Sequence, residues 1–174
     1  GTDFTYLHPE VLDDRCSVSN GKLEMFNSIN CEQYTTLILP SVKTISLSNM
    51  KKVEQVWEAG VNVIFTTQIP TQSADLYVAD DSIVSIVESM LTGENGRKAI
   101  FVETPTAQTL NNALTSYTIP DVAFASGSHP FNYIHKVIDN HHLYYFGNID
   151  VSETTNTIIL KHGLSSAVLM DPHT

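Results

Sequence analysis

The alternation of short apolar runs with amphipathic segments constrains the fold of this chain more than any other feature of the sequence. Apolar runs suited to strands that are covered on both faces recur up to residue 125, at 37–39, 63–65, 100–102 and 122–124. The segments between them have helical periodicity over roughly 10 to 15 residues, a length typical of parallel crossover connections. The sequence therefore predicts an α/β fold with a mainly parallel sheet that contains these four strands and has helices on both faces.

Capping residues mark the ends of the clearest predicted helix. Residues 47–59 carry an apolar stripe that includes Trp57, with Ser46 as N-cap and Gly60 as the stop. We therefore expect Trp57 to be buried against the sheet. The other predicted elements are helices at 8–14, from 80 or 81 to 93, and from 104–105 onward, and a hairpin turn at 19–22.

The alternation of predicted strands and helices ends near residue 129. Strand-length segments separated by polar turns follow, at 133–138, 143–146, 154–160 and 167–170, with turns at 139–140 and 162–163. We therefore predict an α/β domain over 1–128 and an antiparallel β segment over 129–174. Because four strands with one exposed face are marginally stable alone, this segment either packs on the α/β domain or is the truncated start of a β-sandwich.

Charge and composition argue against several partners and cofactors. Acidic residues outnumber basic ones by 19 to 9, for a formal net charge of -10, whereas a nucleic-acid binder needs a concentrated cationic face. No apolar run approaches the roughly 20 residues of a membrane helix. The glycines form no phosphate-binding pattern, and Cys16 and Cys31 are too few for a four-cysteine zinc site or a disulfide scaffold. We predict no nucleic-acid partner, no membrane segment and no cofactor.

One serine-containing loop is the candidate for catalysis. Ser126, Ser128 and His129 follow the last predicted parallel strand, at the sheet edge where α/β enzymes place their sites. A small-molecule hydrolase or amidotransferase-like site is one hypothesis for this loop. A domain linker is the favoured alternative, because Ser, Gly and Pro cluster at boundaries and no nucleophile elbow is present.

Carboxylates and histidines offer two weaker hypotheses. Acidic residues cluster in the first helix and at 80–81, where they favour the helix dipole and need no catalytic role. His141 and His142 are strand neighbours and point to opposite faces, whereas His135 and His142 face each other across the predicted hairpin. Because no third ligand is evident, we predict no metal site.

Three tyrosines in the same segment are candidates for sugar stacking. These are Tyr133, Tyr144 and Tyr145. Aromatic residues that alternate along strands are more often part of a core. A carbohydrate-binding module is therefore a further hypothesis, behind the core interpretation.

Several stretches of the sequence resemble one enzyme family. The matching stretches are 6–16, 34–40, 59–67, 68–75, 143–148 and 168–174. They resemble a segment of large bacterial glycoside hydrolases of the α-L-rhamnosidase type. The sequence departs from that pattern at Val61, where the family often has a second glycine, and at Met170, which replaces a tryptophan.

The resemblance implies fold and context and brings no catalytic residue. It implies an accessory flavodoxin-like or glutaminase-like domain that follows a catalytic barrel and leads into a β-sandwich. Its partners would be those two domains of the parent chain, with an edge left for substrate access or oligomer contact, in the periplasm or outside the cell. We therefore expect a non-catalytic piece of a longer glycoside hydrolase that acts on plant or microbial polysaccharide.

Overall fold

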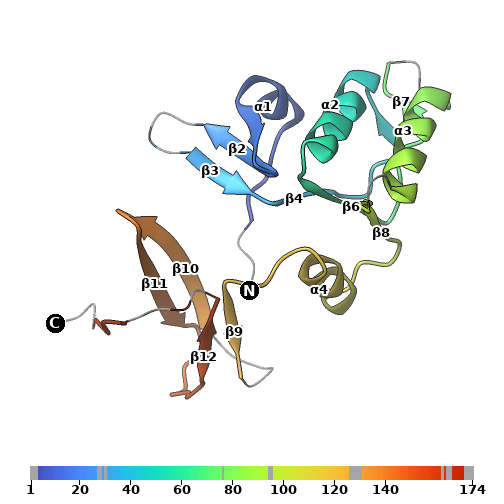
Figure 1. Cartoon of the computed structure of the whole chain (residues 1–174). Coiled ribbons are helices and arrows are strands. Elements are labelled where there is room, and N and C mark those ends of the chain that lie inside the picture. Colours follow the sequence, from blue (N-terminus) through green and yellow to red (C-terminus); the bar gives the residue numbers. More distant parts are fainter. Residues whose placement is uncertain are drawn as a thin grey trace. The chain divides into compact units, whose positions relative to one another are not determined.

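The computed structural model describes residues 4–26, 29, 31–75, 77–93, 96–125, 131–161, 163 and 166–170 (Figure 1). It has two compact units, which are described separately below. The N-terminal unit is Tyr6–Thr118, and the C-terminal unit is Ile119–Thr174 together with Gly1–Thr5. No helix in the described part of the chain is long and apolar enough to span a bilayer.

A parallel sheet forms the centre of the N-terminal unit. Its strands are β4 (Thr36–Leu39), β6 (Asn62–Thr66) and β8 (Ile100–Val102), in the order β4-β6-β8. Both pairings are parallel, so the prediction is confirmed for three of its four strands. The α/β class is thereby confirmed, with a parallel sheet of three strands, and its flavodoxin-like or glutaminase-like form stays a prediction.

Helices cover both faces of this sheet, as predicted. On one face, Val63 and Phe65 belong to the same buried cluster as residues of α2 (Leu47–Glu58) and α3 (Asp81–Thr92). On the other face, Ile64 packs with Ala113 of α4 (Ala107–Thr115). Figure 1 shows α2 and α3 above the sheet and α4 below it. The alternation follows from the strand period of two.

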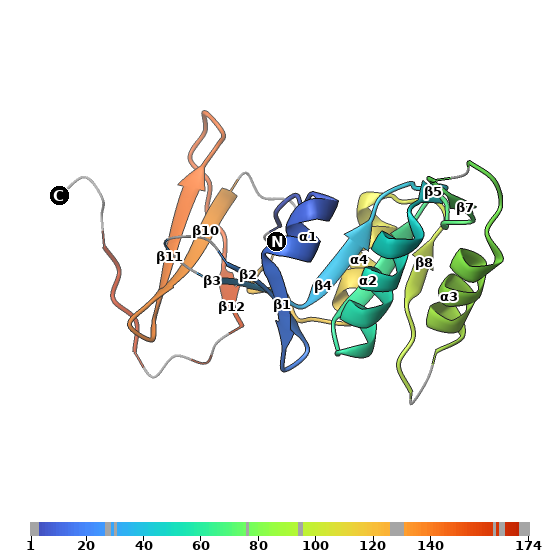
Figure 2. The same ribbon diagram turned by 90° about the horizontal axis from the view of Figure 1, so that it is seen from above.

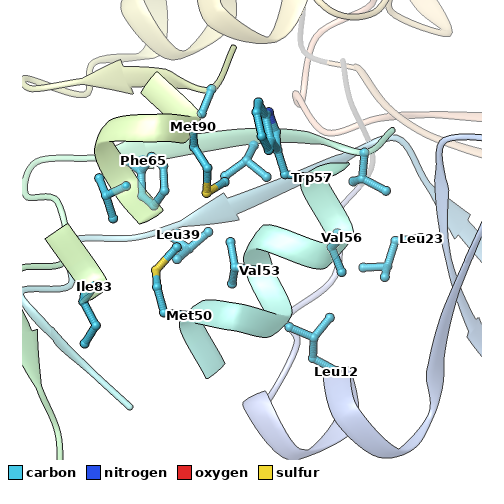
Figure 3. Close-up of a cluster of buried hydrophobic side chains, with 14 residues drawn as sticks. Leu12, Leu23, Leu39, Met50, Val53, Val56, Trp57, Phe65, Ile83 and Met90 are labelled. Atoms are coloured by element: carbon cyan, nitrogen blue, oxygen red, sulfur yellow. The ribbon is translucent and has the colours of Figure 1, made fainter. Parts of the chain in front are cut away.

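The apolar side chains of α2 face the larger of the two buried clusters among the described residues, which we call the main core. Met50, Val53, Val56 and Trp57 are all buried. Figure 3 shows these side chains directed toward the sheet and toward Leu12 and Leu23, which come from α1 (Pro9–Asp14) and β2 (Lys22–Phe26). The expectation that Trp57 is buried is confirmed.

Local signals set the helix ends. The Asn49 backbone N–H donates to Ser46 Oγ at 3.2 Å, so Ser46 caps α2 as predicted. Asp80 caps α3 through the N–H groups of Ser82 and Ile83, and Gly93 follows its last residue. The helix predicted from 104–105 onward begins later than expected, because Thr106 provides the N-cap of α4.

An antiparallel sheet precedes the parallel one. It contains β1 (Cys16–Ser19), β2 and β3 (Cys31–Tyr34), in the order β1-β2-β3. Asn20 and Gly21 both have positive φ, 52° and 71°, which confirms the predicted hairpin turn. The sequence did not predict β3, and the β-rich stretch 34–39, which contains the predicted strand 37–39, is divided at Thr35 between two sheets. Two short strands, β5 (Thr44–Ile45) and β7 (Gln72–Ser73), form a separate parallel pair.

The C-terminal unit corrects the fourth predicted parallel strand. β9 (Val122–Phe124) pairs antiparallel with β12 (Ile158–Leu160), where it buries Val122 completely. A run of three apolar residues shows that a strand forms but does not specify its partner, and here the partner lies far along the chain. The prediction that these residues extend the parallel sheet was wrong.

A long hairpin completes this unit. β10 (Phe131–Ile138) pairs antiparallel with β11 (His141–Asn148) around Asp139 and Asn140, both of which have positive φ (Figure 2). Both strands and this turn were predicted. The strand expected over 154–160 is limited to β12. Residues 167–170 form no strand, so the prediction of a strand there was wrong. The turn expected at 162–163 includes His162, and the predicted domain boundary falls within 126–130; both lie outside the described residues, and the boundary stays a prediction.

Candidate functional site

The predicted catalytic loop lies outside the part of the chain that the structure describes. This loop contains Ser126, Ser128 and His129. The hypothesis that these residues form a hydrolase site therefore stays a prediction. The described residues offer two other polar sites, one in each unit.

A chain of polar contacts in the C-terminal unit links four residues. His135 Nε2 lies 2.9 Å from His142 Nδ1, and His135 Nδ1 lies 3.2 Å from Asp121 Oδ2. Lys161 Nζ lies 3.9 Å from the other oxygen of Asp121. Hairpin register explains the histidine contact, because His135 pairs with Tyr144, and His142 is therefore its diagonal neighbour on the same face.

An aromatic ring covers this polar chain. The ring of Tyr144 stacks on that of His135, with centroids 4.2 Å apart and planes 5° apart. Burial, with a smaller contribution from Asp121, raises the pKa of Tyr144. Its hydroxyl is buried without a hydrogen-bond partner among the described residues. The tyrosine therefore stays neutral and shields the histidine pair from water.

The predicted facing of His135 and His142 is confirmed, and it does not create a metal centre within the described residues. They contain no group of three or more His, Cys, Asp or Glu side chains that could hold a metal ion. Asp121 reaches the second nitrogen of His135 and thereby orients its ring. Asp121 was not predicted from the sequence to belong to this site, because its position depends on the β9–β12 pairing.

The three candidate sugar-stacking tyrosines lie on two faces of the hairpin. Tyr133 packs against Phe146 with centroids 6.1 Å apart, on the same face as Tyr144. Tyr145 lies on the opposite face and is 55% exposed. The three rings therefore form no common platform, and a sugar-binding role for any of them stays a prediction.

The acidic residues of the N-terminal unit have observed structural roles. Asp80 caps α3, and Glu10 lies in the first turn of α1 behind the N-cap His8. Asp13 lies 3.9 Å from Lys52 in a partly exposed ion pair. The helix-dipole interpretation therefore holds for Asp80 and Glu10, whereas Asp13 lies in the last turn of α1 and has Lys52 as its partner.

The first of two hollows in the N-terminal unit lies between the β1–β2 hairpin and α2, with a volume of about 210 Å³. Cys16 and Lys52 are in its lining. Burial raises the pKa of the Cys16 thiol, against a smaller opposing effect of Lys52. A thiol that stays protonated is a poor nucleophile, so this hollow does not resemble a cysteine active site.

The second hollow lies where β8 ends and α4 begins. Its volume is about 510 Å³, and its polar lining comes from Glu103, Thr104, Thr109 and Asn112. Open α/β sheets bind ligands at the carboxyl ends of their strands, and this hollow occupies such a position. Sequence reasoning missed it, although the predicted strand ends were a usable signal.

The neighbouring strand ends in a strained turn. Thr67, directly after β6, has a φ of 65°, and the Gln68 N–H donates to Thr66 O at 2.7 Å, which closes a three-residue turn. A β-branched residue with positive φ is a genuine outlier. The Thr67 N–H donates to Val102 O at 2.9 Å, which fixes this turn beside the end of β8. The two strand ends together carry hydroxyl, amide and carboxylate side chains.

One comparison with known proteins gives a result. A family model described as alpha-L-rhamnosidase matches the chain over residues 1–174. No curated protein and no solved structure gives a significant match.

Proposed function

Because the chain belongs to the alpha-L-rhamnosidase family of glycoside hydrolases, we propose that it is a non-catalytic accessory domain of such an enzyme. The observation that carries this proposal is the family match over the whole chain, combined with structural roles for the acidic groups that the sequence singled out. Glycoside hydrolysis uses two carboxyl groups across a cleft, one as an acid and one as a base or nucleophile. Asp80, Glu10 and Asp13 are instead engaged at helix starts and in an ion pair.

The surface of the C-terminal unit supports a place next to other domains of a longer chain. Ile134, Leu143 and Tyr145 lie on one hairpin face and are all exposed. Leu169, near the end of the chain, is 99% exposed. Exposed apolar side chains that share one hairpin face favour coverage by another protein surface. On this proposal, the catalytic barrel and a β-sandwich of the parent provide that cover, in the periplasm or outside the cell.

The flavodoxin-like or glutaminase-like form of the fold is part of the same proposal. Its support is the parallel β4-β6-β8 sheet with helices on both faces. The polar strand ends at Thr67 and Glu103 would then be the edge that contributes to substrate access.

An activity assay tests the non-catalytic role. The purified chain is incubated with aryl α-L-rhamnoside, aryl β-galactoside, glutamine and short-chain aryl esters, and we expect no turnover above background. Turnover of the rhamnoside that survives repurification would contradict the proposal. Ester or glutamine turnover that is lost in Ser126→Ala or Ser128→Ala, and kept in the control Ser152→Ala, would favour the hydrolase or amidotransferase-like alternative.

A further inference from the structure

The contacts among Asp121, His135 and His142, which we call the histidine latch, connect two separate sheets of the C-terminal unit. His135 and His142 belong to the β10–β11 hairpin, whereas Asp121 directly precedes β9 of the β9–β12 pair. The side chain of His135 is only 13% exposed. The latch is therefore a shielded polar link between the hairpin and its neighbouring sheet.

With Asp121 ionised and both histidines uncharged, the two contacts of His135 place one proton on each ring. An ionised carboxylate only accepts, so His135 must donate to Asp121 from Nδ1. A neutral His135 then has a bare Nε2, and His142 must donate to it from Nδ1. Both histidines are therefore Nδ1–H tautomers.

The ring arrangement favours a shared proton over a shared metal. The two imidazole planes differ by 19°, and their centroids are 5.1 Å apart with 2.9 Å between the facing nitrogens. The rings therefore meet end to end, as an N–H···N hydrogen bond requires. A tetrahedral ion would need the two lone pairs to converge on a third point.

We propose that the histidine latch is a proton-operated switch. The latch holds the hairpin to β9 when the histidine pair carries no added proton or one added proton. It opens when the pair takes up a second added proton. With one added proton, the Nδ1 proton of His142 passes to Nε2 of His135, and the added proton binds Nε2 of His142. His135 then donates from both nitrogens, and His142 accepts at Nδ1. With two, an N–H on each ring points at the other across 2.9 Å, and two positive charges are adjacent. That state retains no hydrogen bond between the rings.

The surrounding groups determine how the latch responds to acid. Asp121 stabilises the first added proton, while Lys161, which follows β12, is a fixed positive charge beside that carboxylate. Tyr144 from β11 stacks on His135 and excludes water, and Tyr133 lies on the same face of β10. These groups all lie on or beside the face where the latch forms. Opening requires a second proton on the pair, so we expect it on acidification.

Histidine side-chain NMR on the intact chain tests the neutral state. At pH 7.5, long-range ¹H–¹⁵N spectra should show the proton of His135 and of His142 on Nδ1, with His141 on the opposite hairpin face as the internal reference. A proton on Nε2 of either latch histidine would overturn the proposal. A spectrum that changes on addition of EDTA would also overturn it, in favour of a bound metal.

Amide hydrogen exchange tests the opening. Between pH 7 and pH 4.5, protection factors of the β10–β11 amides should fall by about tenfold, the expected effect of one lost hydrogen bond. Amides of β6 in the N-terminal unit should keep theirs, which separates opening from global unfolding. An unchanged hairpin would contradict the proposal.

Two matched variants assign this effect to the histidine pair. His142→Asn places an amide near the position of Nδ1, where it can donate or accept but cannot take up a second proton, so the fall in protection should be less than twofold. The control His141→Asn should behave like the natural sequence. If His142→Asn shows the full fall, then acid acts through another group and the proposal fails.

Discussion

At the scale of single residues, two glycines show how closely the first hairpin approaches α2. Gly60 has a φ of 112°, and a Cβ added there would lie 2.7 Å from the Cα of Gly21. Both the backbone conformation and the space therefore require glycine at this position. The hairpin turn and the residue that follows the C-cap of α2 therefore meet backbone to backbone at these two glycines.

Gly60→Ala should lower the free energy of unfolding by about 2 to 4 kcal/mol, through overpacking and left-handed strain together. Denaturant unfolding of the purified variant measures this change. Gly96→Ala is the control, because Gly96 also has positive φ but an added Cβ would meet no atom within 4 Å. It should cost about 1 kcal/mol from strain only. Equal effects of the two substitutions would show that the contact with Gly21 is not important.

Arg97 links α2 to the strand that follows it. Its guanidinium donates to Trp57 O at 2.8 Å and to Val61 O at 3.1 Å, and lies 5.7 Å from the centroid of the Trp57 ring. It thereby ties the last turn of α2 to the start of the next strand. The sequence shows Arg97 only as one of a basic pair with Lys98.

Arg97→Lys should lower the free energy of unfolding by about 1 to 2 kcal/mol, although the charge is retained. A lysine cannot donate to both carbonyls through a planar fork, and it stacks less well on an indole ring. Thermal or urea unfolding provides the measurement, with Arg15→Lys at an exposed position as the control. A variant as stable as the natural chain would mean that these contacts add nothing beyond charge.

At the scale of elements, α2 provides the largest apolar contribution to the main core through Trp57. This side chain is only 5% exposed and belongs to the cluster that joins the sheet to α1, α2 and α3. Trp57→Ala should lower the free energy of unfolding by about 3 to 5 kcal/mol, while Trp57→Phe should lower it less. Urea titration checks both values. An unchanged midpoint and slope for Trp57→Ala would contradict the packing of this helix face.

The sequence predicted elements well where the signals were local. α2 and α3 have capping residues at their starts and glycines just past their ends, so their bounds were found. β9 and β3 depend on partners elsewhere in the chain. β3 also has an exposed, polar sequence with no apolar alternation. Its separation from β4 at Thr35 therefore had no local signal.

The candidate sites were also predictable only where they depend on local sequence signals. The facing of His135 and His142 depends on hairpin register around a two-residue turn, which the sequence does encode. Asp121 reaches the pair only because β9 joins β12. The hollow at Glu103 lies at the end of a strand that the sequence did predict, but its shape also depends on how α4 packs on β8.

At the scale of the whole molecule, two tyrosines contribute to how stability responds to alkaline pH. Burial raises the pKa of Tyr117, against a smaller opposing effect of Arg97, and burial also raises that of Tyr144. The Tyr117 hydroxyl donates to Lys98 O at 2.8 Å. A raised pKa means that the folded state favours the neutral phenol. The resulting contribution to the free energy of unfolding is complete below the tyrosine pKa of the unfolded chain, near 10. It is lost as the pH rises above that pKa.

The free energy of unfolding should therefore fall between pH 9 and pH 11, and Tyr117→Phe should make that fall smaller. At pH 8 the same substitution should cost about 1 kcal/mol, from the lost hydrogen bond. Chemical unfolding at a series of pH values measures both effects. Tyr77→Phe, at an exposed position, is the control and should leave the pH dependence unchanged. The same slope in both variants would contradict a role for Tyr117.

The two ways in which strands pair in this molecule differ in how quickly each can assemble. β4, β6 and β8 are parallel, so each pairing must wait until a whole helical connection has crossed the sheet. Contacts between residues so far apart in sequence slow folding. The β10–β11 hairpin closes around Asp139 and Asn140, and hairpins form in roughly 1 to 10 microseconds. During refolding, the β10–β11 hairpin should therefore form before the parallel sheet, because its contacts are local in the sequence.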